Sequence, residues 1–118
     1  MKKENIILDK AFVFALSIIE LYKQMIEQKE YVLSKQILRS GTNIGANVEE
    51  ATAAISKKDF TAKMSIASKE ARETRYWLQL LDKSQVVNID FKKHIDEIEN
   101  IVNILTAIVK TSQGNDEC

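Results

Sequence analysis

The sequence predicts an all-α protein, folded as an antiparallel four-helix bundle that runs up-down-up-down. The 118 residues contain no proline and only three glycines, whereas an all-β domain needs many tight turns built from these two residue types. Four segments place apolar residues at alternating steps of three and four, the spacing of one helix face. A chain of this length is typical of one domain, so we expect a single bundle over residues 1–118.

The first helix is expected at about residues 5–28, because an apolar stripe at helical spacing runs from Ile7 to Met25. A second apolar row widens the apolar surface of this segment: Ala15, Ile19, Tyr22 and Ile26. The last segment also carries apolar residues on more than one face. A bundle needs only one apolar stripe per helix, so this surplus indicates contact with a partner subunit.

The remaining helices are expected at about residues 31–55, 58–83 and 88–111. The stripe of the second runs from Ile37 to Ile55, and Ser56 and Asn88 are candidate caps for the third and fourth. The breaks between segments are short, and short connections force consecutive helices to run antiparallel. Residues 112–118 are polar, so we expect a frayed tail.

Charge and composition exclude several classes of function. The 17 basic and 17 acidic residues cancel, which argues against coating nucleic acid or a membrane by bulk charge. One histidine and one cysteine exclude a zinc finger and a disulfide framework. The apolar run from Ala11 to Ile19 is too short to span a bilayer. We therefore expect no membrane partner, and the single Cys118 suits the reducing cytoplasm.

No catalytic motif is visible, and we expect neither an enzyme nor a cofactor. A bundle that holds two iron or manganese ions needs a Glu-x-x-His motif on each of two helices, but His94 is the one histidine here. A serine hydrolase of the common α/β type needs a Gly-x-Ser-x-Gly elbow, which this chain lacks. The sequence therefore predicts no catalytic residue and no metal site.

A polar stretch that contains Gly41 and Gly45 lies within the second predicted helix. The two glycines are four residues apart and therefore share one helix face, where another backbone can approach closely. A phosphate-binding loop is excluded, because no strand precedes the stretch and no Gly-Lys-Ser/Thr follows it. Arg39, Asn43 and Glu50 fall opposite the core stripe. A solvated face, an oligomer interface and an interior ion pair with Glu70 or Glu73 stay open for these side chains.

The strings RSGTNIGANVEEA and KKDFTAKMSIASKEARETRYWLQLL resemble the four-helix-bundle proteins encoded in bacterial 23S rRNA intervening sequences, also called S23 ribosomal proteins. The positions that match the family pattern are Arg39, Ser40, Asn47, Glu50, Phe60, Ala67, Glu73 and Leu78. Ala51 departs from it, since many members have glycine there. The resemblance covers essentially the whole chain and places Arg39, Asn47, Glu50 and Glu73 in the family motif. Together with Asn43 of the polar stripe, these residues are the candidate motif and interface residues.

The resemblance implies an antiparallel four-helix bundle without an established enzymatic activity. Some relatives assemble as pentameric rings, so it implies a homo-oligomer, with a five-membered ring as the expected form. The accessory proteins of diversity-generating retroelements are similar. They are pentameric and basic, and they bind nucleic acid and a reverse transcriptase. For this chain the resemblance therefore favours RNA or DNA as a partner.

The third predicted helix carries an excess of basic residues. Residues 57–75 contain six basic and three acidic residues, and residues 88–118 show the opposite bias. Lys58, Lys69, Arg72 and Tyr76 project opposite the core stripe. This arrangement is suited to gripping phosphates and stacking a base. The opposite bias of the two segments is equally suited to contact between subunits, so a protein-interaction scaffold with no nucleic-acid role stays open.

Overall fold

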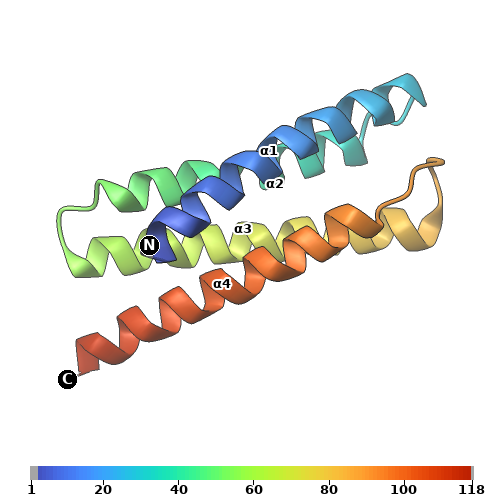
Figure 1. Ribbon diagram of the computed structural model, residues 1–118. Coiled ribbons are helices and arrows are strands. Elements are labelled where there is room, and N and C mark those ends of the chain that lie inside the picture. Colours follow the sequence, from blue (N-terminus) through green and yellow to red (C-terminus); the bar gives the residue numbers. More distant parts are fainter. Residues whose placement is uncertain (1–2, 118) are drawn as a thin grey trace.

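The structure, a computed structural model, describes residues 3–117, with side chains from residue 5 to residue 114. It forms four helices, α1 (Lys3–Glu27), α2 (Leu33–Thr52), α3 (Lys57–Ser84) and α4 (Lys92–Glu117), packed into an elongated bundle of 50 × 24 × 22 Å. Each helix packs against its neighbours in the chain, and α1 also packs against α4. Helix α1 is therefore diagonal to α3. The predicted all-α, up-down-up-down bundle is confirmed (Figure 1).

The core is built from the apolar stripes of all four helices. The side chains of Ile7, Phe14 and Leu21 on α1 are almost completely buried, as are Ile44 on α2 and Leu78 on α3. Two hydroxyl pairs interrupt the apolar core. Thr74 on α3 donates to Ser40 on α2 over 2.8 Å, and Thr61 on α3 contacts Ser112 on α4. Both pairs are buried, so each satisfies polar groups that would otherwise be costly to bury.

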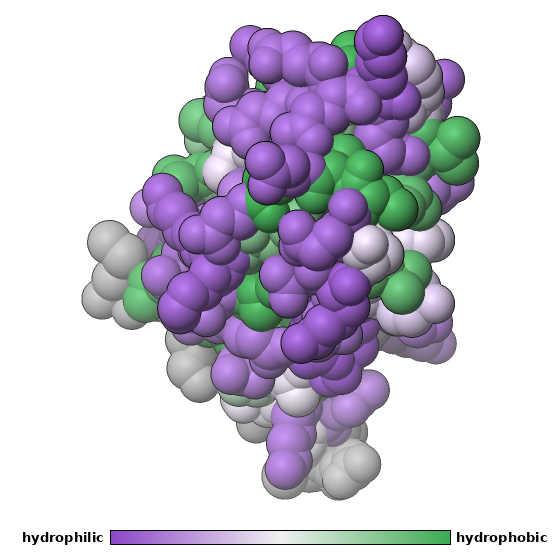
Figure 2. All heavy atoms as spheres, turned by 90° about the vertical axis from the view of Figure 1, so that its right-hand side faces the viewer, coloured by the Kyte–Doolittle hydropathy of each residue, from purple (hydrophilic) through white to green (hydrophobic). Residues whose placement is uncertain are grey.

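Side chains in the two loops at one end of the bundle fix the helix ends there. The Glu30 carboxylate accepts from the backbone N–H of Ser34 at 2.7 Å and of Val32 at 3.3 Å, so it caps the start of α2 from outside the helix. The Gln28 side-chain amide donates to the Asn88 carbonyl at 3.0 Å and accepts from the Asn88 N–H at 2.6 Å. This contact joins the two loops. The surface at this end is mostly hydrophilic, with hydrophobic areas between (Figure 2).

Several predicted helix limits are wrong. Helix α2 ends at Thr52, so Ile55 lies in the loop and is 95% exposed instead of continuing the core stripe. Helix α4 begins at Lys92 and not at residue 88, because Asn88 bonds with Gln28 and the Asp90 carboxylate accepts from the Lys92 N–H at 3.0 Å. Ser56 does cap α3, by accepting from the Asp59 N–H.

The predicted frayed tail at residues 112–118 is also wrong within the described part of the chain. Helix α4 continues to Glu117, and residue 118 lies outside the described residues. Ser112 is buried against Thr61, so α4 still packs on α3 where the sequence turns polar. A short polar side chain can therefore continue a buried face when a second hydroxyl meets it.

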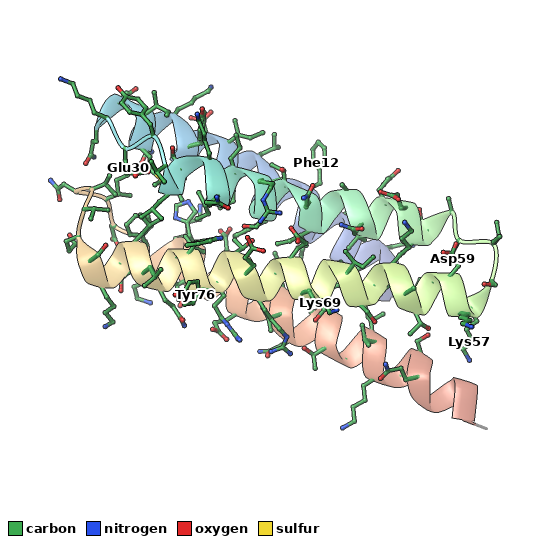
Figure 3. The ribbon with its side chains drawn as sticks, turned by 180° about the vertical axis from the view of Figure 1, so that it is seen from behind. Phe12, Glu30, Lys57, Asp59, Lys69 and Tyr76 are labelled. Carbon is green, nitrogen blue, oxygen red and sulfur yellow. The ribbon has the colours of Figure 1, made fainter. Side chains whose placement is uncertain are left out.

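The extra apolar residues predicted on the first and last helices differ in burial. In the described part of α4 every large apolar side chain is buried or half-buried. Helix α1 instead exposes four large apolar side chains, namely Phe12 (65%), Val13 (61%), Leu16 (51%) and Ile19 (37%). Phe12 projects away from α3 (Figure 3). Within residues 3–117, no helix is both long and apolar enough to cross a membrane.

Candidate nucleic-acid interface

The side of α3 that faces away from the core carries the predicted basic residues. Lys58, Lys69, Arg72 and Tyr76 are all exposed, and we call these four the basic stripe. The core side of α3 carries Met64, Ala67, Ala71, Thr74, Leu78 and Leu81. The stripe therefore follows the outer surface, and Lys69 and Tyr76 lie on the side of α3 away from α2 (Figure 3).

Two contacts position the centre of the basic stripe. The Arg72 guanidinium donates to the Thr106 hydroxyl of α4 at 2.9 Å, so the charge lies where α3 and α4 meet. The Tyr76 ring is 55% exposed and packs edge-on against Trp77, with ring centroids 5.3 Å apart. The contact with Trp77 restrains the tyrosine ring while leaving much of it open to a ligand.

Four acidic residues near the stripe are paired with other cations. Glu70 and Glu73 contact Arg39, Glu50 contacts Lys63 at 3.0 Å, and Glu99 contacts Arg75 at 3.5 Å. The cations of the stripe, Lys58, Lys69 and Arg72, have no carboxylate within 4 Å among the described side chains. Their charges are therefore not neutralised by close ion pairs within this part of the chain.

One further lysine extends the stripe and was not predicted from the sequence. Lys83 is exposed near the end of α3, and its position 14 residues after Lys69 brings it back to nearly the same side of the helix. It too lacks a carboxylate partner among the side chains that the structure describes. Continuing the helical spacing beyond Tyr76 would have found it.

Arg39 forms an ion-pair cluster that joins α2 to α3. Its guanidinium contacts Glu70 at 3.3 Å and also Glu73, and the Trp77 indole N–H donates to the Glu73 carboxylate at 3.0 Å. Of the alternatives left open by the sequence, the structure shows the ion pair with Glu70 and Glu73, but it lies at the surface and not in the interior. The Arg39 side chain remains 48% exposed, so the cluster lies at the surface, where α2 meets α3.

The other motif residues on α2 make local contacts. The Asn47 side chain donates to the Asn43 carbonyl at 2.8 Å, one turn earlier in the helix. Glu50 reaches across to Lys63 on α3, and this hydrogen bond is the main reason that the pKa of Lys63 is raised above its usual value. Of these contacts, only the one between Glu50 and Lys63 joins α2 to α3, and Asn43 and Asn47 are half-buried.

Gly41 and Gly45 face α1. A Cβ atom at Gly41 would lie 2.9 Å from two carbons of the Ile18 side chain, and one at Gly45 would lie 3.6 Å from the Ala11 carbonyl oxygen. The glycines therefore allow α1 to pack closely against α2. Among the described residues, no group of three or more His, Cys, Asp or Glu side chains could hold a metal ion.

The fold and this surface define a class, a four-helix-bundle protein with an outward basic stripe. The family model of the 23S rRNA-intervening sequence protein matches residues 3–107. The chain is also similar to a crystal structure of a protein of unknown function from the S23 ribosomal protein family of Bacteroides thetaiotaomicron, with 46% identity and a TM-score of 0.87 over 92% of this chain and 99% of that one. Comparison with curated proteins finds no match. The chain belongs to the 23S rRNA-intervening sequence protein family, which confirms the resemblance.

Proposed function

We propose that this protein is a non-enzymatic, self-associating bundle of the cytoplasm that contacts RNA or DNA through the basic stripe on α3. The observation that carries the proposal is the stripe itself, whose three cations have no carboxylate within 4 Å among the described side chains. Unpaired cations on an exposed helix face attract phosphates, and the half-exposed Tyr76 ring offers a surface on which a base can stack.

Self-association increases the affinity for nucleic acid that a small basic stripe can provide. One protomer has no net charge, so three or four local cations give it only weak attraction for nucleic acid. Several copies in a closed assembly present several stripes to one ligand, and linked contacts raise the overall affinity without new chemistry. A pentameric ring, as the family resemblance implies, would present five stripes.

A second candidate function is a protein-interaction scaffold with no nucleic-acid role. The exposed apolar side chains of α1 favour it, because a contiguous apolar patch on a helix surface is typical of a protein contact. The two candidates differ in one respect that can be measured. Only the first predicts binding to RNA or DNA that weakens as salt increases.

The test is a binding titration with a fluorescein-labelled stem–loop RNA and a DNA of the same sequence, followed by fluorescence anisotropy at several salt concentrations. We expect Lys69→Glu to weaken binding roughly tenfold or more, about 1.4 kcal/mol, and to reduce the slope of log K against log salt by about 1 per bound protomer. The matched control is Lys35→Glu, which makes the same charge change on an exposed lysine of α2.

Three results would contradict the nucleic-acid proposal. These are the absence of binding by the wild type at low salt, binding that does not depend on salt, and equal losses from Lys69→Glu and Lys35→Glu. The first result would favour the scaffold, and the last would mean that overall charge and not the stripe governs binding. Thermal melting followed by circular dichroism checks that both variants stay folded.

A further inference from the structure

The outward face of α1 carries a second stripe at regular helical spacing, in addition to the core stripe. Its members are separated by alternating steps of four and three and are all exposed: Asn5, Asp9, Phe12, Leu16, Ile19 and Lys23. We call these six residues the α1 seam. This spacing is that of the contact line in a coiled coil. The centre of the seam is apolar, with Phe12 65% and Leu16 51% exposed.

The charges of the α1 seam are arranged symmetrically about its centre. Asp9 precedes Leu16 by seven residues, and Lys23 follows it by seven. If two copies of α1 lie antiparallel and cross at Leu16, Asp9 of each copy meets Lys23 of the other. If they lie parallel, like charges meet instead. Opposite charges across a helix pair select both partner and orientation, so the sequence of α1 complements itself only in the antiparallel arrangement.

Asp9 and Lys23, the charged residues of the α1 seam, form no strong ion pair among the described side chains. Asp9 has no cation within 4 Å among the described side chains. Lys23 contacts Glu20 on the same helix at 3.2 Å, but both side chains are more than 60% exposed, and such pairs contribute little to stability. Both charges therefore remain available to a second molecule.

A groove beside the seam provides space for incoming side chains. It lies between α1 and α2, has a volume of about 620 Å³, and is lined by Phe12, Val13, Gly45 and Ala46 among others. On the α2 side the groove is lined by the small residues Gly45 and Ala46, and on the α1 side by Phe12 and Val13. A helix that lies along α1 can therefore insert side chains next to the exposed apolar residues of the α1 seam.

We propose that a second copy of this protein docks on the α1 seam, with the two α1 helices antiparallel and a two-fold axis at Leu16. The inference rests on the proposed self-association and adds its geometry. Such a contact uses the same surface on both copies and closes after two, so it joins two protomers or two rings and cannot by itself build a five-membered ring. Because α1 is diagonal to α3, the contact leaves the basic stripe open.

Charge exchange within one chain tests the antiparallel contact. We expect Asp9→Lys and Lys23→Asp each to halve the mass measured by light scattering at low salt, because like charges then meet at both ends of the contact. The double variant carrying both changes restores the opposite pairing and therefore the wild-type mass. The control Lys35→Asp changes the charge of an exposed lysine on α2 and leaves the mass unchanged.

Cross-linking provides a second readout that does not depend on charge. In a Cys118→Ser background, Leu16→Cys places a thiol at the proposed two-fold axis, and mild oxidation is expected to link most of the protein in pairs. Ala62→Cys, on the exposed side of α3, is the control that stays unlinked. An assembled protein whose mass is insensitive to both α1 charge changes, or equal linking at residues 16 and 62, overturns the inference but not self-association. A wild-type mass of one protomer overturns both.

Discussion

At the scale of single residues, the fold changes the pKa of His94. This histidine lies in the first turn of α4, where its ring approaches the backbone of Ser17 on α1. Its Nδ1 atom is buried and has no hydrogen-bond partner among the described residues. Burial lowers the pKa of the imidazole below its usual value, and Glu97 opposes this shift only in part. The folded protein therefore favours the neutral ring, because a proton on Nδ1 would have no acceptor.

This burial predicts that stability falls in mild acid. The pKa of His94 is lower in the folded than in the unfolded protein, so the unfolded state binds more protons as the pH drops below about 6.5. Stability is fully present above that pH and is lost towards the lower pKa of the folded state. We expect His94→Gln to show a smaller loss of unfolding free energy between pH 7.5 and 5.5, measured by urea denaturation. Since this is the only histidine, an equal loss in both proteins would contradict the assignment.

At the scale of elements, the contact between α1 and α2 depends on two glycines that are not equivalent. Glycine within a helix costs up to about 1 kcal/mol relative to alanine, so each position needs a packing reason. Gly41 has one, because an added Cβ would meet the branched Ile18 side chain at 2.9 Å. Gly45 has ordinary contact distance to Ala11 and could accept a methyl group.

The two glycines therefore give a matched pair of substitutions. Gly41→Ala is expected to destabilise the protein by about 1 kcal/mol net, because overpacking costs about 1–3 kcal/mol and outweighs the gain in helix propensity. Gly45→Ala is expected to stabilise it by up to about 1 kcal/mol. Chemical denaturation of both variants measures the difference. Similar changes in unfolding free energy for the two variants would show that Ile18 does not pack closely against Gly41.

The apolar periodicity of the sequence was sufficient to predict which elements form but not where each one ends. The core stripe of α1 is buried as predicted, from Ile7 to Met25. The limit near Asn88 was missed because it depends on a contact distant in the sequence, the bond between Gln28 and Asn88. The limit near Ile55 was missed because the apolar spacing continues past Thr52, where the helix ends. Glu30 was missed as a cap because it lies outside the helix that it stabilises. The bond between Gln28 and Asn88 joins residues 60 apart in the sequence, so it leaves no local pattern in the sequence.

At the scale of the whole molecule, the bundle separates two surfaces. The exposed apolar residues of α1 and the basic stripe of α3 lie on diagonal helices, and Phe12 projects from the opposite side of the bundle to Lys69 (Figure 3). One side is therefore available for assembly while the other contacts a ligand. The sequence predicted the stripe by helical spacing. It could not show that Glu70 and Glu73 pair with Arg39 and leave Lys69 without a carboxylate within 4 Å among the described side chains, because that choice depends on the packing of α2 on α3.

The mass of the protein in solution, by light scattering at low and high salt with and without the stem–loop RNA, tests the central claim most directly. We expect a mass well above the 13.5 kDa of one chain at both salt concentrations, since an apolar contact survives salt. We also expect an increase with RNA at low salt that high salt reverses. A mass of one chain that RNA does not change would contradict both the self-association and the nucleic-acid contact.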